Sequence, residues 1–187
     1  TYHNDAQRTG WNANETQLTP QTVASPRFGR LWRTPQFDSF GGRPPRLHAS
    51  PLYVDRIKIS GGEHAGKSFP VIYAVTSVGY LYAVSAFATR DVPAGTVLWR
   101  RRLTERPCLN GDYGNLSTPV IDRNKQRIYV TSCDSELKWR AHALDITSGP
   151  VTVRWPNTAA RTVGEDEIGH GLSARKVRGG DDLAIVG

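Results

Sequence analysis

Two loops of this chain carry side chains that can move protons. Asp112 lies in the turn-rich stretch Asn110–Asn115, which leads into the inner strand of a predicted sheet. A carboxylate at that point is expected to face the centre of the fold, where it could act as a general base. His170 stands between Gly169 and Gly171 in a second loop and is the best functional candidate among the histidines. These two residues are the candidates for catalysis.

An acidic run close to His170 is the candidate metal site. Glu165, Asp166 and Glu167 supply carboxylate oxygens, the ligands that hard cations such as Ca²⁺ prefer. Three adjacent side chains alternate in direction along an extended chain, however, and a solvated polar loop is the alternative interpretation. The histidines show no spacing typical of zinc sites.

The tryptophans fall into two groups. Trp32, Trp99 and Trp155 each end a predicted outer strand, and we interpret them as packing residues between neighbouring sheets. An indole in that position buries apolar area and donates its N–H to the neighbouring backbone. Trp11 and Trp139 do not occupy that position. These two are therefore the candidates for contact with a bound ligand or cofactor.

The two cysteines lie in segments that an antiparallel sheet would bring together. Cys108 precedes the strand predicted to begin near Thr118, and Cys133 ends the strand expected to pair with it. The end of one antiparallel strand lies beside the start of its partner. A disulfide is one interpretation, and two unrelated small core residues are the other. A disulfide would indicate an oxidising compartment.

A repeated pattern of short strands must position these residues. Within 117–155, four apolar segments rich in β-branched and aromatic residues alternate with turns. The same order occurs over 48–102, and the matching residues Ser50 and Thr118 lie 68 positions apart. A four-stranded repeat of ~40–50 residues is typical of a propeller blade. We therefore predict an all-β fold, a partial β-propeller of four-stranded antiparallel blades.

The repeat divides the chain into five segments, of which two are complete blades. They are an irregular N-terminal segment (1–27), the outer strand and linker of an incomplete blade (28–47), the two blades (48–102 and 117–155) and the start of a further blade (162–187). The outer strand of the incomplete blade is expected near Phe28–Thr34. One helical turn is expected within Pro20–Ala24. The excess length of the first blade lies in two insertions, 60–68 and 86–94.

The number of blades predicts that other polypeptide completes the fold. About two and a half blades are present, whereas closed propellers have roughly four to eight. The sequence contains no Met, and its last strand, 182–187, has no predicted partner for its apolar edge. We expect a fragment of a longer chain, with the ring completed by its remaining blades or by a partner polypeptide.

The charge of the chain is modest and dispersed. The formal net charge is +7, and the densest basic cluster is Arg100–Arg102. We interpret this cluster as a solvated outer strand, because no basic stripe interleaved with aromatic residues accompanies it. No apolar run reaches the ~20 residues of a membrane span. Neither a nucleic-acid partner nor a membrane span is expected.

The turns of the repeats resemble a known signature. Residues 143–149, Ala-Leu-Asp-Ile-Thr-Ser-Gly, are similar to the Ala-x-Asp-x-x-Thr-Gly-x-x-x-Trp repeat of pyrroloquinoline-quinone (PQQ) propellers, with Ser for Thr and with Trp155 two residues late. Gly95 and Trp99 keep the Gly-to-Trp spacing, although Ser85 replaces the Asp. The opening of the chain is similar to the start of secreted PQQ-like repeat proteins. The resemblance covers most of the sequence.

The resemblance implies an extracellular or periplasmic location and leaves two functions open. One is a secreted or periplasmic binding or scaffold module. The other is a quinone (PQQ)-dependent alcohol or sugar dehydrogenase, an oxidoreductase in which a carboxylate base, Ca²⁺ or a similar ion, and aromatic or disulfide surfaces surround the quinone. PQQ and Ca²⁺ would then be the cofactors. The sequence lacks the adjacent cysteine pair that stacks on the quinone in some family members, which favours the first function.

Overall fold

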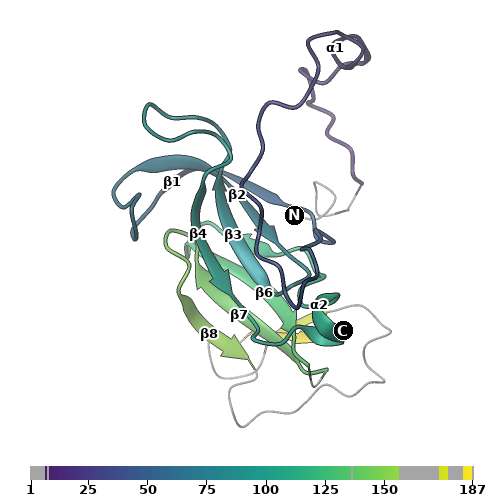
Figure 1. The fold of residues 1–187 in the computed structure, drawn as a ribbon, viewed down its shortest axis with the longest axis vertical. Helices are drawn as coiled ribbons and strands as arrows, with labels where there is room; N and C mark the ends of the chain where they lie inside the picture. Colours follow the sequence, from purple (N-terminus) through teal and green to yellow (C-terminus); the bar gives the residue numbers. More distant parts are fainter. Residues whose placement is uncertain (1–6, 8, 136, 156–172, 177–182, 187) are drawn as a thin grey trace.

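The protein is built mainly from antiparallel sheet (Figure 1). The computed structural model describes residue 7, residues 9–135 and 137–155, and the backbone of two further strands. In chain order the elements are α1 (Pro20–Val23), β1 (Leu52–Lys58), β2 (Ser68–Val75), β3 (Tyr80–Ser85), β4 (Val97–Arg102), α2 (Cys108–Gly111), β5 (Val120–Asp122), β6 (Arg127–Cys133), β7 (Trp139–Asp145), β8 (Val151–Trp155), β9 (Ser173–Lys176) and β10 (Leu183–Val186). The predicted all-β class is confirmed.

Two four-stranded sheets dominate the fold, and each follows a simple meander. The first sheet has the order β1-β2-β3-β4 and the second has the order β5-β6-β7-β8, all antiparallel. They lie within the two segments expected to form complete blades. The strand expected at the C-terminal end also forms, but it has a partner: β10 pairs antiparallel with β9. The expectation of an unpaired last strand is therefore wrong, because the preceding strand β9 pairs with it.

The hairpin between the third and fourth strands is closed in the same way in both sheets. Gly95 donates its N–H to the carbonyl of Ser85 at 2.8 Å, and Gly149 donates to the carbonyl of Asp145 at 2.9 Å. Both glycines have φ near +80°, in the left-handed region that favours glycine. The insertion 86–94 thus enlarges the first turn without changing its closing bond.

The two sheets pack face to face over one hydrophobic core. Strand alternation places Val71 and Tyr73 of β2 on the face that meets the second sheet, and Ile128 and Leu144 lie opposite them in the same cluster. These four side chains are fully buried. Because burial of each large apolar side chain contributes roughly 1.5–3 kcal/mol, this shared core holds the two sheets together.

The outer strand expected at Phe28–Thr34 is not formed. The described residues before β1 contain no strand and only a single isolated bridge, between Phe40 and Arg43. Leu31 is 87 % exposed. A strand requires a ladder of backbone hydrogen bonds with a neighbouring segment, and this segment forms none among the described residues. The segment instead runs as extended chain past the first sheet, and α1 lies at its far end (Figure 1).

A strap formed by residues 37–43 covers part of the outer face of the first sheet. The ring of Phe37 stacks on Tyr82 with 4.0 Å between centroids. The Tyr82 hydroxyl donates to the Asp38 carboxylate at 2.6 Å, and Arg100 of β4 forms an ion pair with the same oxygen. Burial, aided by the bond to Asp38, raises the pKa of Tyr82. The Arg100–Arg102 cluster therefore has a structural partner in this strap.

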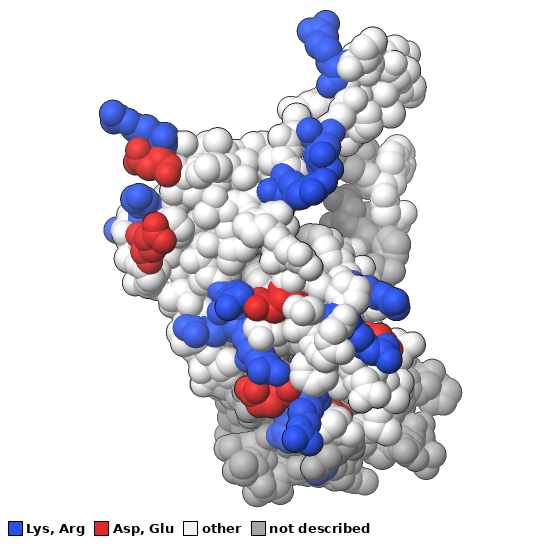
Figure 2. Space-filling view, in the orientation of Figure 1, with Lys and Arg blue, Asp and Glu red and all other residues white. Residues whose placement is uncertain are grey.

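The described surface carries interspersed charges of both signs. On the face shown in Figure 2, acidic side chains lie beside basic ones over the sheets, whereas the N-terminal arm shows basic side chains. Ion pairs such as Arg102–Glu105 and Arg140–Asp134 account for part of this pattern. No helix in the described part of the chain has the length and apolar character to cross a membrane.

Candidate functional site

The turn between β7 and β8 packs against the first sheet. The carbonyl of Ile146 accepts two hydrogen bonds from that sheet, one from the Tyr73 hydroxyl at 2.8 Å and one from the Trp99 indole N–H at 3.2 Å. Thr147 adds a hydroxyl contact of 2.6 Å to Ser60. Ile146 itself is buried. These bonds satisfy polar groups that the packing of the two sheets removes from water.

The indole of Trp99 lies directly against Gly149 in this turn. A Cβ added at Gly149 would lie 2.6 Å from Cε3 of Trp99, which is closer than real Cβ contacts. Arg101, two residues further along β4, donates Nε–H to the carbonyl of Gly149 at 2.9 Å. Glycine is therefore required here both by backbone conformation and by space. The predicted role of Trp99, packing between sheets with its N–H on a neighbouring backbone, is confirmed.

A second contact of the same kind occurs at Gly95. A Cβ at Gly95 would lie 2.9 Å from Cε3 of Trp32 and 2.7 Å from the carbonyl oxygen of Arg33. The first sheet thus receives an indole on its turn glycine, as the second sheet receives Trp99. Trp32 thus packs on the turn of the first sheet, as predicted, but it does not come from the outer strand of another sheet, because its segment is not a strand.

The contact between the two sheets around Ile146, here called the seam, has a titratable group at its centre, Tyr73. Its side chain is fully buried, and burial raises its pKa, with a smaller contribution from the negative charge of Asp145. Both effects favour the neutral phenol. Only the neutral phenol can donate a hydrogen bond to the Ile146 carbonyl. The raised pKa and this hydrogen bond are therefore consistent with each other.

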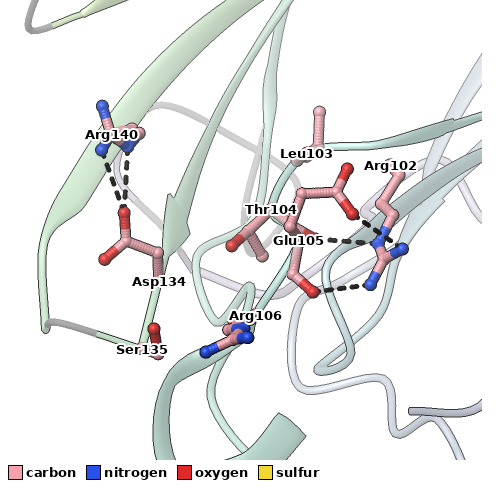
Figure 3. A pocket seen from close by; sticks show the side chains of 8 residues that line it. All are labelled: Arg102, Leu103, Thr104, Glu105, Arg106, Asp134, Ser135 and Arg140. Atoms are coloured by element: carbon pink, nitrogen blue, oxygen red, sulfur yellow. Dashed lines mark hydrogen bonds and ion pairs between the residues drawn. The ribbon is translucent and has the colours of Figure 1, made fainter.

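A polar cleft of about 390 Å³ opens at one end of the two sheets (Figure 3). One wall is formed by the end of β4 and the connection after it, and the other is formed by the β6–β7 hairpin. The residues that line the cleft are Arg102, Leu103, Thr104, Glu105, Arg106, Asp134, Ser135 and Arg140. The cleft therefore contains three guanidinium groups, two carboxylates and two hydroxyls.

Two of the three arginines are held in place by neighbouring groups. Arg102 pairs with Glu105 at 2.9 Å and also donates to the Thr104 and Glu105 carbonyls. Arg140 directs Nε and Nη2 to one oxygen of Asp134, each at 3.1 Å. Arg106 is exposed and lies below Thr104 in Figure 3. Fixed guanidinium groups around a cleft can recognise an anion with little loss of side-chain entropy.

A disulfide holds the two walls of the cleft together. Cys108 and Cys133 are joined, with 5.4 Å between their Cα atoms, as one interpretation of the sequence proposed. An isolated bridge pairs Pro107 with Asp134 beside it. Arg106 precedes this junction on one wall and Asp134 follows it on the other. The disulfide therefore fixes the spacing between the residues that face each other across the cleft.

Asp112, the candidate base, lies at the end of α2 and outside the cleft. Its carboxylate forms an ion pair with Arg43 of the strap. The Arg43 and Asp112 side chains are 48 % and 29 % exposed. The pair ties the strap to the α2 loop, where Phe40 also contacts Gly111. The structure thus gives Asp112 a structural partner and does not bring it together with the other candidates that it describes, Trp11 and Trp139.

The two tryptophans proposed for ligand contact lie in different surroundings. Trp11 is 73 % exposed in the N-terminal segment. Trp139 begins β7, is half-buried, and pairs with Cys133 across the ladder. Trp139 is thus close in sequence and register to the cleft, whereas Trp11 belongs to a segment that extends from the sheets. The described geometry does not form one aromatic site from the two.

The remaining candidates lie outside the described residues. These are the proposed metal ligands Glu165, Asp166 and Glu167 and the proposed catalytic His170. Among the residues that are described, no group of three or more His, Cys, Asp or Glu side chains could hold a metal ion. The proposed Ca²⁺ site therefore stays a prediction.

The cleft was not predicted from the sequence. Arg106, Thr104 and Arg140 belong to no motif, and the first two lie in the connection after β4. The signal available was their position beside the cysteines. A predicted disulfide marks the chain segments that must lie together, so the charged residues near one cysteine are expected to lie close to those near the other.

The comparisons with known proteins add no further evidence on family or function. No model of a protein family, no curated protein and no solved structure matches this chain.

Proposed function

We propose that this chain is part of a PQQ-like β-propeller and acts as a secreted or periplasmic binding or scaffold module. The observation that carries the proposal is the contact of Trp99 with Gly149 and Ile146, together with its counterpart at Trp32 and Gly95. A contact that recurs from one repeat to the next supports side-by-side stacking of equivalent units. Such stacking is how propeller blades bury their faces.

The inner ends of the two sheets support the same arrangement. Ser50 donates its N–H to the hydroxyl of Thr118 at 3.0 Å, and these residues occupy matching positions in the two repeats. When repeats are related by rotation about an axis, their matching residues lie closest together near that axis. The contact therefore favours an axis beside the beginnings of β1 and β5.

The Cys108–Cys133 disulfide supports the proposed location. Structural disulfides are typical of secreted, extracellular or periplasmic proteins and are rare in reducing compartments. A binding role is favoured by the position of the polar cleft, which lies at the end of the sheets where loops carry recognition residues.

A titration with the cofactor of the alternative function tests this proposal. The protein is titrated with PQQ in the presence of CaCl₂ by calorimetry, and dye reduction is followed with alcohol and sugar substrates. A module that serves binding or assembly gives no substrate-dependent dye reduction. Turnover that requires both PQQ and Ca²⁺ would overturn the proposal in favour of a quinone-dependent dehydrogenase.

A further inference from the structure

We propose that the cleft beside the disulfide binds a small hydroxylated organic acid, whose carboxylate is held by Arg106. The inference rests on the proposed function only in that the module binds a ligand. The cleft itself is formed by described residues of 102–140, so it does not depend on how the ring of blades is completed.

Unused donors are the first reason for this assignment. Arg106 has no hydrogen bond or ion pair to any residue that the structure describes. Arg140 instead directs Nε and Nη2 to a single oxygen of Asp134, so its guanidinium is already engaged. A guanidinium group binds a carboxylate through two parallel N–H bonds, so Arg106 alone can hold the carboxylate of a ligand.

Thr104 supplies an independent observation. Its side chain is only 7 % exposed, and its hydroxyl has no hydrogen-bond partner among the described residues. In Figure 3 this hydroxyl is directed toward the wall that carries Asp134 and Arg140. A buried hydroxyl without a partner is rare, since its desolvation is not offset. An oxygen of a bound ligand would satisfy it.

Charge and size decide between an organic acid and an inorganic anion. The cleft holds three arginines and two acids, Asp134 and Glu105, which gives one net positive charge. That balance suits a monoanion, whereas a dianionic phosphate would be repelled by the carboxylates of Asp134 and Glu105. A volume of about 390 Å³ lies within the range of small-molecule sites, roughly 300–1,000 Å³, and exceeds what a single inorganic ion fills. Asp134 and Glu105 can accept hydrogen bonds from hydroxyls on the body of the ligand.

Calorimetric titration of the protein tests the ligand class. The probes are galacturonate, gluconate and tartrate, with galactose and inorganic phosphate as contrasts. We expect saturable binding of at least one of the three acids and weaker or no binding of the two contrasts. The proposal is overturned if none of the acids binds, if galactose binds as tightly as galacturonate, or if phosphate binds more tightly than every acid.

Two variants locate the binding in the cleft. Arg106→Gln removes a side chain with no described partner, and we expect roughly a 10- to 100-fold loss of affinity, as for a charge-assisted hydrogen bond. The matched control is Arg90→Gln, which removes the same charge from the β3–β4 loop at the opposite end of the first sheet. Equal affinities in the two variants would contradict the proposal.

Thr104→Val separates ligand binding from a structural role. Valine has nearly the same shape and lacks the unpartnered hydroxyl. We expect affinity to fall about five-fold while the denaturant midpoint of the free protein stays the same or rises. A lower midpoint with unchanged affinity would show that the hydroxyl serves the fold, and would remove it from the site. Failure of these tests leaves the contacts between the sheets, and hence the proposed function, unaffected.

Discussion

Trp99 covers Gly149 so closely that no side chain fits between them. The nearest ring atom would lie 2.6 Å from a Cβ at that glycine, whose φ is +79°. One residue therefore meets two separate demands, a left-handed turn that closes β7–β8 and a flat surface for the indole of the neighbouring sheet. The same pair of demands recurs at Gly95 beneath Trp32. The spacing of Gly and Trp in the sequence thus reflects contacts between repeats as well as turns within them.

Gly149→Ala tests both demands at once. We expect the free energy of unfolding to fall by about 2–4 kcal/mol, the sum of the left-handed penalty and the overpacking of Trp99. Gly62→Ala is the matched control, since Gly62 has φ of +73° but nothing within 4 Å of an added Cβ. That variant should lose only about 1–2 kcal/mol. Equal losses in urea denaturation would mean that the indole contact is absent.

Replacement of Tyr73 by Phe tests the polar part of the seam. The variant loses the bond to the Ile146 carbonyl, and we expect a loss of about 0.5–1.5 kcal/mol at neutral pH. Because burial raises the pKa of Tyr73, the folded protein retains the phenol proton above pH ~10, where an unfolded tyrosine begins to lose it. The contribution of Tyr73 is thus fully present below pH ~10 and is lost as pH rises towards the folded-state pKa.

Alkaline denaturation measures this effect. Stability of the wild type should decline more steeply above pH ~10 than stability of Tyr73→Phe. Tyr53→Phe controls for the general effect of alkali, because Tyr53 is 55 % exposed. Tyr82, whose pKa is also raised, keeps some alkaline slope in both variants. Parallel curves for wild type and Tyr73→Phe would contradict the buried position of the phenol.

Local pattern predicted the parts of the fold that depend on neighbouring residues in the chain. Alternating apolar segments and turn glycines identified both meanders and the insertion at 86–94. The strand expected at Phe28–Thr34 did not form because its pattern is strand-like but it makes no ladder with another described segment. Whether a strand forms depends on long-range pairing, which a short sequence segment does not contain.

Register shows a second limit of reasoning from the sequence. Ala83 pairs with Trp99, whereas the matching Ala143 pairs with Val153 and Trp155 pairs with Ala141. Trp155 is therefore two pairs further along its strand than Trp99, in keeping with its position two residues late in the repeat. The cleft was harder still, because its residues come from separate segments and meet only through the disulfide and the sheet.

The ion pair between Arg43 and Asp112 should contribute little to stability. Both side chains are substantially solvated, and such pairs contribute ~0–1 kcal/mol. A double-mutant cycle with Arg43→Gln and Asp112→Asn should give a coupling energy below about 1 kcal/mol, and 1 M NaCl should reduce it further. A coupling above about 2 kcal/mol that salt leaves unchanged would instead indicate a desolvated pair, and would reopen a functional role for Asp112.

Removal of the disulfide should affect both stability and the cleft. Cys108 and Cys133 are 25 residues apart, and a loop of this length predicts a loss of about 3–4 kcal/mol when both are replaced by Ala. Without the link, Arg106 and Asp134 no longer have a fixed spacing across the cleft, so organic-acid affinity should fall as well. Reductant should destabilise the wild type and leave the double variant unchanged, which controls for other effects of the reagent. If stability falls but affinity for galacturonate does not, the Pro107–Asp134 bridge and the surrounding sheet are sufficient to hold the walls in place.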